Sequence, residues 1–167
     1  MPFLIFCKFI FLGNLNMNDE LGYEKQPRAG LIPYTYREDG TMIFLTMIAS
    51  DPKFGGPRPM ISKGKIESNE DSLGAAVREA EEELGLKREN IVGPILEVAK
   101  ERVTLYSGTY LLDVYGCRIL DRYDFDKWCE ETEYIQWFSL EEFAEHGRRD
   151  HYKYLQMLQE QVLNNKD

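Results

Sequence analysis

Four glutamates lie within five positions near the middle of the chain: Glu79, Glu81, Glu82 and Glu83. Like charges four residues apart on a helix repel each other by roughly 0.2–0.5 kcal/mol, so the pairing of Glu79 with Glu83 calls for a nearby cation. Hard divalent cations prefer oxygen ligands, and Mg²⁺ commonly takes one or two carboxylates together with substrate phosphate and water. The cluster therefore suggests a metal site.

Helical periodicity positions these carboxylates. At about 100° per residue, a narrow apolar stripe forms on one side of the helix. Its members are Leu73, Ala76, Val77, Ala80 and Leu84. Glu79, Glu82 and Glu83 share an arc of roughly 100° beside this stripe, whereas Glu81 and Arg78 point elsewhere. Three carboxylates thus converge at the edge of a buried face.

The ends of this helix are also marked in the sequence. Asp71 suits the N-cap position, and Gly85 suits the left-handed residue that closes a helix. Before the helix, Gly64 stands between Lys63 and Lys65. Glycine allows the backbone to approach a ligand closely, and lysines attract phosphate. The loop and the helix together suit a phosphorylated substrate with a bound cation.

Residues 64–86, GKIESNEDSLGAAVREAEEELGL, resemble the Nudix motif G-x5-E-x7-R-E-U-x-E-E-x-G-U, in which U is aliphatic. The match covers every fixed position: Gly64, Glu70, Arg78, Glu79, Glu82, Glu83 and Gly85. More loosely, the order of elements resembles the family over about residues 28–163. The resemblance implies a Nudix-type α/β/α sandwich with a mixed β-sheet. It also implies a metal-dependent hydrolase that cleaves a pyrophosphate bond in a nucleoside diphosphate linked to another group.

The resemblance assigns roles to the motif residues. The carbonyl group of Gly64 would join Glu79, Glu82 and Glu83 in binding Mg²⁺, with Mn²⁺ as an alternative ion. Arg78 and Glu70 would brace the loop against the helix as an orienting pair. The general base in the family is often a glutamate on a late loop that precedes a tryptophan-bearing strand. Three glutamates precede Trp137 here: Glu130, Glu131 and Glu133. Glu131 has the most similar offset, and the alternative is that this acidic loop is only solvated.

Basic and aromatic side chains near the motif are candidates for substrate contacts. Lys63, Lys65 and Arg58 could hold phosphates, or they could be solvated loop charges. Tyr106 and Tyr110 could stack on a base, although strand tyrosines more often pack in a core.

The substrate class stays open at this stage. Dinucleoside polyphosphates, nucleotide sugars, ADP-ribose and nucleoside triphosphates all contain the required linkage. Residues 101–104 lack the proline or tyrosine that marks some Nudix subgroups, while the Lys-Gly-Lys-Ile-Glu start of the motif weakly resembles dinucleoside polyphosphate hydrolases. The rival interpretation is a nucleotide-binding regulatory module without catalysis, which would be expected to lose motif carboxylates.

Composition restricts the remaining possibilities. The 167 residues suit one domain, and a net charge of −9 disfavours a broad nucleic-acid surface, which would normally be basic. The three cysteines lack metal-ligand spacing and indicate free thiols in a reducing compartment, hence a cytoplasmic protein. The sequence leaves a homodimer open.

The apolar N-terminal extension, residues 1–16, precedes a Nudix hydrolase domain expected over 17–167. It is too short to cross a bilayer, which takes about 20 residues, and lacks the parts of a signal peptide. We favour a true translation start at Met17. The alternatives are an anchor for a membrane or partner, or an extra edge strand.

The rest of the chain supplies the elements of the sandwich. Strands are expected over 29–37, 41–48, 91–103 and 104–120, a loop over 51–63, a short strand near 136, and helices beginning near 138 and 150. Pro33 suggests an edge strand or a bulge. Ser139 and Glu142 form a capping box. His146 and His151 are expected to have surface or capping roles.

Overall fold

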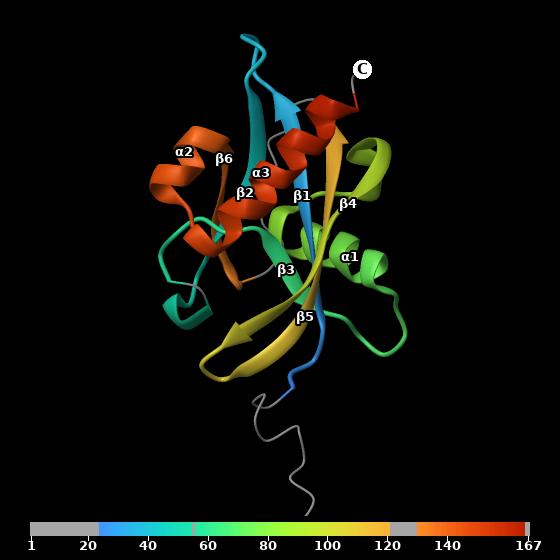
Figure 1. Cartoon of the computed structure of the whole chain (residues 1–167), viewed down its shortest axis with the longest axis vertical. Helices are drawn as coiled ribbons and strands as arrows, with labels where there is room; N and C mark the ends of the chain where they lie inside the picture. The colour runs from blue at the N-terminus through green and yellow to red at the C-terminus, as the bar shows by residue number, and fades with distance from the viewer. Residues whose placement is uncertain (1–23, 55, 121–129, 166–167) are drawn as a thin grey trace, which may run out of the picture.

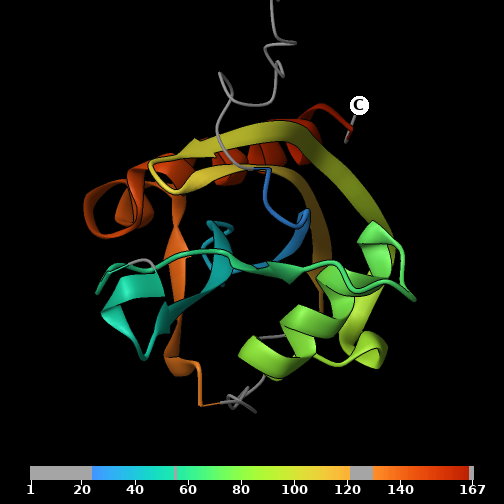
Figure 2. The same cartoon turned by 90° about the horizontal axis from the view of Figure 1, so that it is seen from below.

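The computed structural model describes residues 24–54, 56–120 and 130–165, which form a mixed six-stranded sheet between helices (Figures 1 and 2). The strands are β1 (Arg28–Tyr36), β2 (Met42–Ala49), β3 (Ser62–Lys65), β4 (Ile91–Leu105), β5 (Gly108–Ile119) and β6 (Thr132–Ser139). The helices are α1 (Ser72–Leu84), α2 (Leu140–His146) and α3 (Arg149–Asn164), with short 3-10 turns η1 (Pro52–Phe54) and η2 (Arg88–Asn90). The predicted α/β/α sandwich is confirmed, while the extension over residues 1–16 lies outside the described residues.

The central strand of the sheet is β1. The order is β4-β5-β1-β2-β6, with β3 also paired to β1. Only β1 and β5 run parallel among these pairs. Along the other side of β1, residues 28–31 pair with β3 and residues 34–36 pair with β2. Pro33 lies where one partner gives way to the other, so the expectation of an edge strand was wrong.

Helices cover opposite faces of this sheet (Figure 2). Because side chains alternate between faces along a strand, β1 and β5 contribute to two separate cores. The core beneath α1 includes Ala29, Leu31, Leu45, Met47, Cys117, Ala76, Ala80 and Leu84. The core beneath α3 includes Ile32, Tyr34, Phe44, Leu112, Val114, Tyr154, Leu155 and Leu158. The sheet therefore presents one face to the motif helix and the other to the C-terminal helix.

Local sequence signals fix the motif helix. The side chain of Asp71 accepts a hydrogen bond from the Gly74 amide at 2.7 Å, and Gly85 closes α1 with φ of 72°. Ala75, Ala76 and Ala80 are fully buried. Both predicted caps and the buried stripe are confirmed, with Ala75 added to the stripe and Leu73 and Val77 only partly buried.

Two boundaries differ from expectation. β4 and β5 form a long hairpin that turns at Tyr106 and Ser107, so the predicted break at residue 104 was placed too early. The predicted loop over 51–63 contains η1 and runs into β3.

Near the C-terminus, the capping box of Ser139 and Glu142 is confirmed.

No helix among the described residues is both long and apolar enough to cross a membrane.

Candidate active site

Glu83 is the most deeply placed motif carboxylate. Its Oε2 atom accepts hydrogen bonds from the Ser62 hydroxyl at 2.7 Å and from the Lys63 amide at 3.0 Å. Glu83 is only 7% exposed. The helical wheel placed it beside the buried face rather than on it, and that expectation was wrong because β3 covers this part of α1. Two donors from one strand therefore fix the orientation of the carboxylate.

Glu79 lies against the backbone of Gly64. A Cβ atom added to Gly64 would come within 2.0 Å of the Glu79 carboxyl carbon, so any larger residue would push this carboxylate away from β3. The side chain of Glu79 is 13% exposed. The first glycine of the motif thus allows a carboxylate and a strand backbone to approach each other closely.

These two carboxylates are electrostatically unfavourable without a cation. Burial, together with the charge of Glu79, raises the pKa of Glu83 to about 8, although the hydrogen bond from Ser62 opposes the increase. Burial also raises the pKa of Glu79, and the charges of Glu82 and Glu131 act in the same direction. A divalent cation would relieve both the repulsion and the loss of hydration. The buried, oxygen-only donor set therefore fits Mg²⁺ or Mn²⁺.

Arg78 links the motif helix to the loop before it. Its guanidinium donates to Glu70 at 2.7 and 3.1 Å and to the Lys65 carbonyl at 3.0 Å. It also donates to Glu79 at 2.8 Å and reaches Glu82 at 3.5 Å. The bracing role that the resemblance implies has its contacts here, but the expectation that Arg78 points away from the carboxylates was wrong. Arg78 holds Glu79 and the loop together.

The third motif carboxylate lies at the rim of the site. The side chain of Glu82 is 52% exposed. Among the described residues, no three acidic, histidine or cysteine side chains converge closely enough to form a metal cage by themselves. Such a cage is not required, because Mg²⁺ usually keeps water and substrate oxygens in its coordination sphere.

The late acidic loop ends beside the motif helix. Glu131 lies on the turn before β6, where its carbonyl accepts a hydrogen bond from the Ser50 amide at 2.8 Å. Its carboxylate is exposed, yet its charge contributes to the raised pKa of Glu79. Glu130 precedes it on the same turn, and Glu133 is exposed on β6. Residues 121–129 of the loop lie outside the described residues.

The predicted cationic residues divide between surface and interior. Arg58 and Lys65 are exposed, whereas Lys63 is partly buried on the face of β3 opposite to Glu83. Burial, together with the charges of Arg28 and Arg148, lowers the pKa of Lys63 to about 8. These two arginines were not predicted. Each stands far from the motif in the sequence, and no local pattern distinguishes them.

His151 is a buried structural residue. It is 2% exposed, and its Nδ1 atom accepts a hydrogen bond from the Ile61 amide at 3.2 Å. The expected surface or capping role therefore holds for the exposed His146 and was wrong for His151. Burial lowers the pKa of His151 to about 3, so the ring is neutral as an acceptor. The contact fixes the start of α3 beside the start of β3.

The two candidate tyrosines have different environments. Tyr106 is fully exposed at the tip of the β4–β5 hairpin, whereas Tyr110 is 4% exposed. Lys63 and Arg28 lie over the ring of Tyr110, with their charged groups 5.6 and 5.0 Å from its centroid. The ring of Tyr110 thus makes cation–π contacts with two basic side chains.

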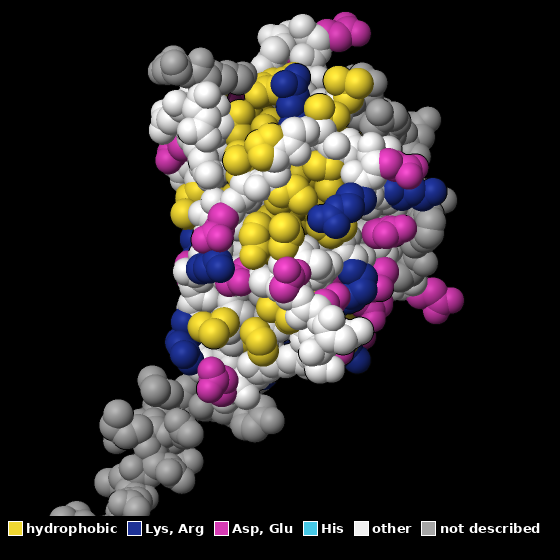
Figure 3. Space-filling view, turned by 90° about the vertical axis from the view of Figure 1, so that its right-hand side faces the viewer, with side chains coloured by type: hydrophobic (Ala, Val, Ile, Leu, Met, Phe, Trp, Pro, Cys, Tyr) yellow, Lys and Arg dark blue, Asp and Glu magenta, His cyan; other side chains and the backbone are white. Residues whose placement is uncertain are grey.

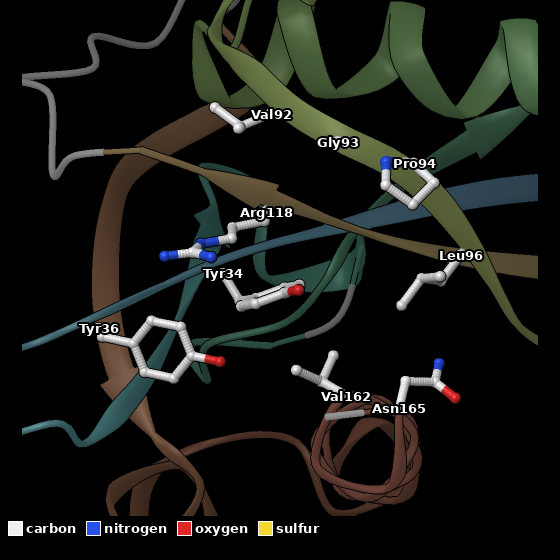
Figure 4. Close-up of a pocket in the computed structure, with 9 residues that line it drawn as sticks. All are labelled: Tyr34, Tyr36, Val92, Gly93, Pro94, Leu96, Arg118, Val162 and Asn165. Carbon is white, nitrogen blue, oxygen red and sulfur yellow. The ribbon is translucent and has the colours of Figure 1, made fainter. Parts of the chain in front are cut away.

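A separate apolar pocket lies at the far end of β1. Its volume is about 320 Å³, and it opens between α3 and the ends of β1, β4 and β5 (Figure 4). The lining residues are Tyr34, Tyr36, Val92, Gly93, Pro94, Leu96, Arg118, Val162 and Asn165. Hydrophobic side chains also gather on the surface that lies to the right in Figure 1 (Figure 3). No motif residue lines the pocket, so its position does not define the chemistry.

Comparison with known proteins agrees with the fold and the motif. The NUDIX domain model matches residues 25–158, and the chain belongs to this family. A search of curated proteins found no matching sequence. The chain is similar to a C. elegans Ap4A hydrolase binary complex, with a TM-score of 0.70 and 19% identity over 84% of this chain and 99% of that chain.

Two further solved structures are similar. One is the NUDIX domain of Shewanella oneidensis NrtR complexed with ADP ribose, with a TM-score of 0.71 and 12% identity over 88% of this chain and 94% of that chain. The other is RenU, a Nudix hydrolase from M. Smegmatis, with a TM-score of 0.68 and 17% identity over 85% and 88% of the two chains. At such low identities the likeness concerns the fold.

Proposed function

We propose that this protein is a metal-dependent pyrophosphohydrolase that acts on a nucleoside diphosphate linked to another group. The observation that carries the proposal is the pair formed by Glu79 and Glu83. Both carboxylates are largely buried, both have raised pKa values, and β3 holds them at fixed positions. A protein gains little stability from such a pair without a cation, whereas a cation site for phosphate chemistry needs it.

In this proposal Glu79, Glu82, Glu83 and the Gly64 carbonyl would hold Mg²⁺, or Mn²⁺ in its place. The ion would neutralise charge on the phosphoryl oxygens and activate water for attack. Arg78 and Glu70 would keep the loop and helix in register. These contacts would hold the site in place before the substrate arrives, which would favour electrostatic stabilisation of the transition state.

Glu131 is the proposed general base. Support comes from its position on a turn beside the motif helix, within electrostatic reach of Glu79. The exposed carboxylate would accept a proton from the attacking water. Proton transfer to a positioned side chain typically contributes about 10²- to 10⁴-fold to the rate.

The phosphates of the substrate would contact basic side chains near the motif. Lys63, Lys65 and Arg58 are the proposed phosphate contacts from the sequence. Solved relatives in fold include an Ap4A hydrolase and a NUDIX domain complexed with ADP ribose. Dinucleoside polyphosphates, ADP-ribose, nucleotide sugars and nucleoside triphosphates therefore belong in the first substrate panel.

The rival function is nucleotide binding without hydrolysis. It is favoured by the contact of Arg78 with Glu79 at 2.8 Å, because an arginine partly neutralises a carboxylate that a metal would use. In that case the protein would bind a nucleotide tightly and release it unchanged.

The test is hydrolysis of the substrate panel with Mg²⁺ or Mn²⁺, with products identified by chromatography. We expect one substrate to be cleaved at a pyrophosphate bond and activity to disappear with a chelator. Glu82→Gln should reduce turnover at least about 10²-fold, by analogy with other losses of transition-state charge stabilisation.

Glu81→Gln is the matched control, because it removes the same charge from the same turn of α1 without belonging to the predicted metal arc. It should retain turnover within about twofold. Tight nucleotide binding with no product under either metal would support the rival function instead.

A further inference from the structure

Three cations meet on the face of β3 that is turned away from the motif carboxylates. Arg28 pairs with Lys65 across β1 and β3, and Lys63 pairs with Gly30. Paired residues on neighbouring strands point to the same face, and so do Lys63 and Lys65, which are two residues apart on β3. The side chains of Arg28 and Lys63 therefore lie on one side of the sheet. Both approach the ring of Tyr110.

The start of α3 brings the third cation to this place. The Arg148 amide donates a hydrogen bond to the Pro59 carbonyl at 2.9 Å, and the Ile61 amide donates one to Nδ1 of His151. These contacts fix Arg148 beside the segment that enters β3. The charges of both Arg28 and Arg148 oppose the increase in pKa that burial causes at Tyr110. Arg28 and Lys63 thus lie over the Tyr110 ring, and Arg148 is close enough for its charge to act on both Tyr110 and Lys63. We refer to the three side chains as the Arg28–Lys63–Arg148 cluster.

The cluster has more positive charge than its protein partners balance. Asp150 accepts hydrogen bonds from Arg148 at 3.0 and 2.5 Å, which offsets one cation. The neighbouring Lys153 is already paired with Glu101 at 2.6 Å. Arg28 Nε is buried and has no hydrogen-bond partner among the residues that the structure describes. Buried guanidinium donors are normally satisfied, so this atom points to a missing acceptor.

We infer that the Arg28–Lys63–Arg148 cluster binds the part of a polyphosphate chain that extends beyond the cleaved pyrophosphate, so the preferred substrate carries at least three consecutive phosphates. This inference rests on the proposed function for its catalytic meaning. Glu83 accepts a hydrogen bond from the Lys63 backbone while the Lys63 side chain turns to the cluster. The Glu79–Glu83 pair and the cluster thus lie on opposite faces of the same strand, β3.

Charge matching favours a chain of phosphates over ADP-ribose or a nucleotide sugar. The cluster contains three cations. When the negative charge of Asp150 is counted, its net charge is about +2. Guanidinium groups bind phosphate oxygens in a bidentate manner, and charge-assisted bonds of this kind are roughly twice as strong as neutral ones. A sugar would leave these cations unneutralised, which carries a cost because buried charges without partners are unfavourable.

The first test measures binding of inorganic triphosphate and of pyrophosphate by calorimetry, with chelator present. The wild-type protein should bind triphosphate more tightly than pyrophosphate. Arg28→Gln and Arg148→Gln should each weaken triphosphate binding at least tenfold, and Arg28→Lys and Arg148→Lys should restore part of it. The matched control is Arg149→Gln, which removes the same charge from an exposed neighbouring residue and should change binding less than twofold.

The second test compares kcat/KM for a nucleoside triphosphate, a dinucleoside tetraphosphate and ADP-ribose. Arg148→Gln should lower kcat/KM at least tenfold for the first two and less than threefold for ADP-ribose. If Arg28→Gln does not fold, Arg148→Gln decides, with its melting midpoint measured alongside.

Equal effects of Arg148→Gln and Arg149→Gln, or no difference between triphosphate and pyrophosphate, would overturn the inference. Triphosphate binding that depends on the cluster in a protein without hydrolase activity would instead refute the proposed function and leave the anion subsite standing.

Discussion

The two faces of β3 carry opposite chemistry. On the α1 face, Ser62 and the Gly64 backbone position two acidic side chains. On the α3 face, Lys63 and Arg28 lie over the ring of Tyr110, and the charge of Arg148 acts on it. The acidic face comes from one continuous stretch of sequence, whereas the basic face is assembled from three distant segments. A short strand thus separates the proposed metal site from the proposed phosphate site.

Among changes that leave the motif carboxylates in place, the largest effect on the acidic face is expected from Gly64→Ala. The new Cβ atom would occupy the place of the Glu79 carboxyl group, which would have to move. A displacement of about 1 Å in a catalytic site can cost on the order of 10²-fold in rate, so we expect a loss of that size with a small change in melting midpoint. Kinetic assays and thermal unfolding would measure both.

The double variant provides the control for that change. In a Glu79→Ala background, Gly64→Ala should cause little further loss, because the two residues act through the same contact. Fully additive losses would mean that Gly64 acts independently of Glu79.

A smaller effect is expected from the late loop. Glu131→Gln should lower kcat at least about tenfold and leave KM nearly unchanged, because a general base acts in the transition state. Glu130→Gln and Glu133→Gln are the matched comparisons and should do less. If all three variants match the wild type, the loop has no chemical role. A loss confined to Glu130→Gln or Glu133→Gln would reassign the base within the same loop.

The contact between α3 and β3 predicts a dependence of stability on pH. The pKa of His151 is about 3 in the folded protein and about 6.5 in an unfolded chain. Between these values the unfolded chain binds a proton that the folded protein does not, so the free energy of unfolding decreases as pH falls below about 6.5. One such group contributes up to about 1.4 kcal/mol per pH unit.

His151→Asn should remove this contribution while keeping an acceptor for the Ile61 amide. Urea unfolding of both proteins between pH 4.5 and 8, in steps of about half a unit, would measure it. The wild-type protein should lose stability more steeply on acidification. Parallel curves for the two proteins would show that His151 does not titrate on unfolding.

The smallest effect is expected from removal of residues 1–16. The composition changes abruptly at Met17, from a strongly apolar to a polar stretch. A chain that starts at Met17 should match the full chain in turnover and melting midpoint. Insolubility, or a midpoint lower by many degrees, would place the segment in the core of the domain.

Local signals in the sequence were sufficient to predict the motif helix. Asp71, Gly85 and the spacing of alanines each act within a few residues of one another, so caps and buried face could be read directly. The capping box at Ser139 and Glu142 is of the same kind. The order of the elements followed from signals of this kind, whereas the sandwich was implied by the resemblance to the Nudix family.

The environment of the carboxylates depended on a strand that carries little signal. β3 has four residues, Ser-Lys-Gly-Lys, with no apolar alternation. Its pairing with β1 buries Glu83 and gives it Ser62 as a donor. A helical wheel contains only the helix, so it could not place Glu83 under a strand.

The basic face was harder still to predict from the sequence. Arg28 and Arg148 reach Lys63 only through the register of β1 with β3 and the docking of α3 on residues 59–61. Register is a tertiary property, and a shift of one residue would turn these side chains to the other face. Lys63 was predicted from its place beside Gly64, but its partners required the fold.

Direct measurement of metal binding tests the proposed metal site at Glu79 and Glu83. Calorimetric titration with Mn²⁺ and Mg²⁺ should compare the wild-type protein, Glu83→Gln and the control Glu81→Gln at one pH. We expect Glu83→Gln to weaken metal binding at least tenfold, because it removes a carboxylate that two β3 donors hold in place. Glu81→Gln should bind as the wild type does. Equal metal affinities for all three proteins would contradict a metal site at Glu79 and Glu83.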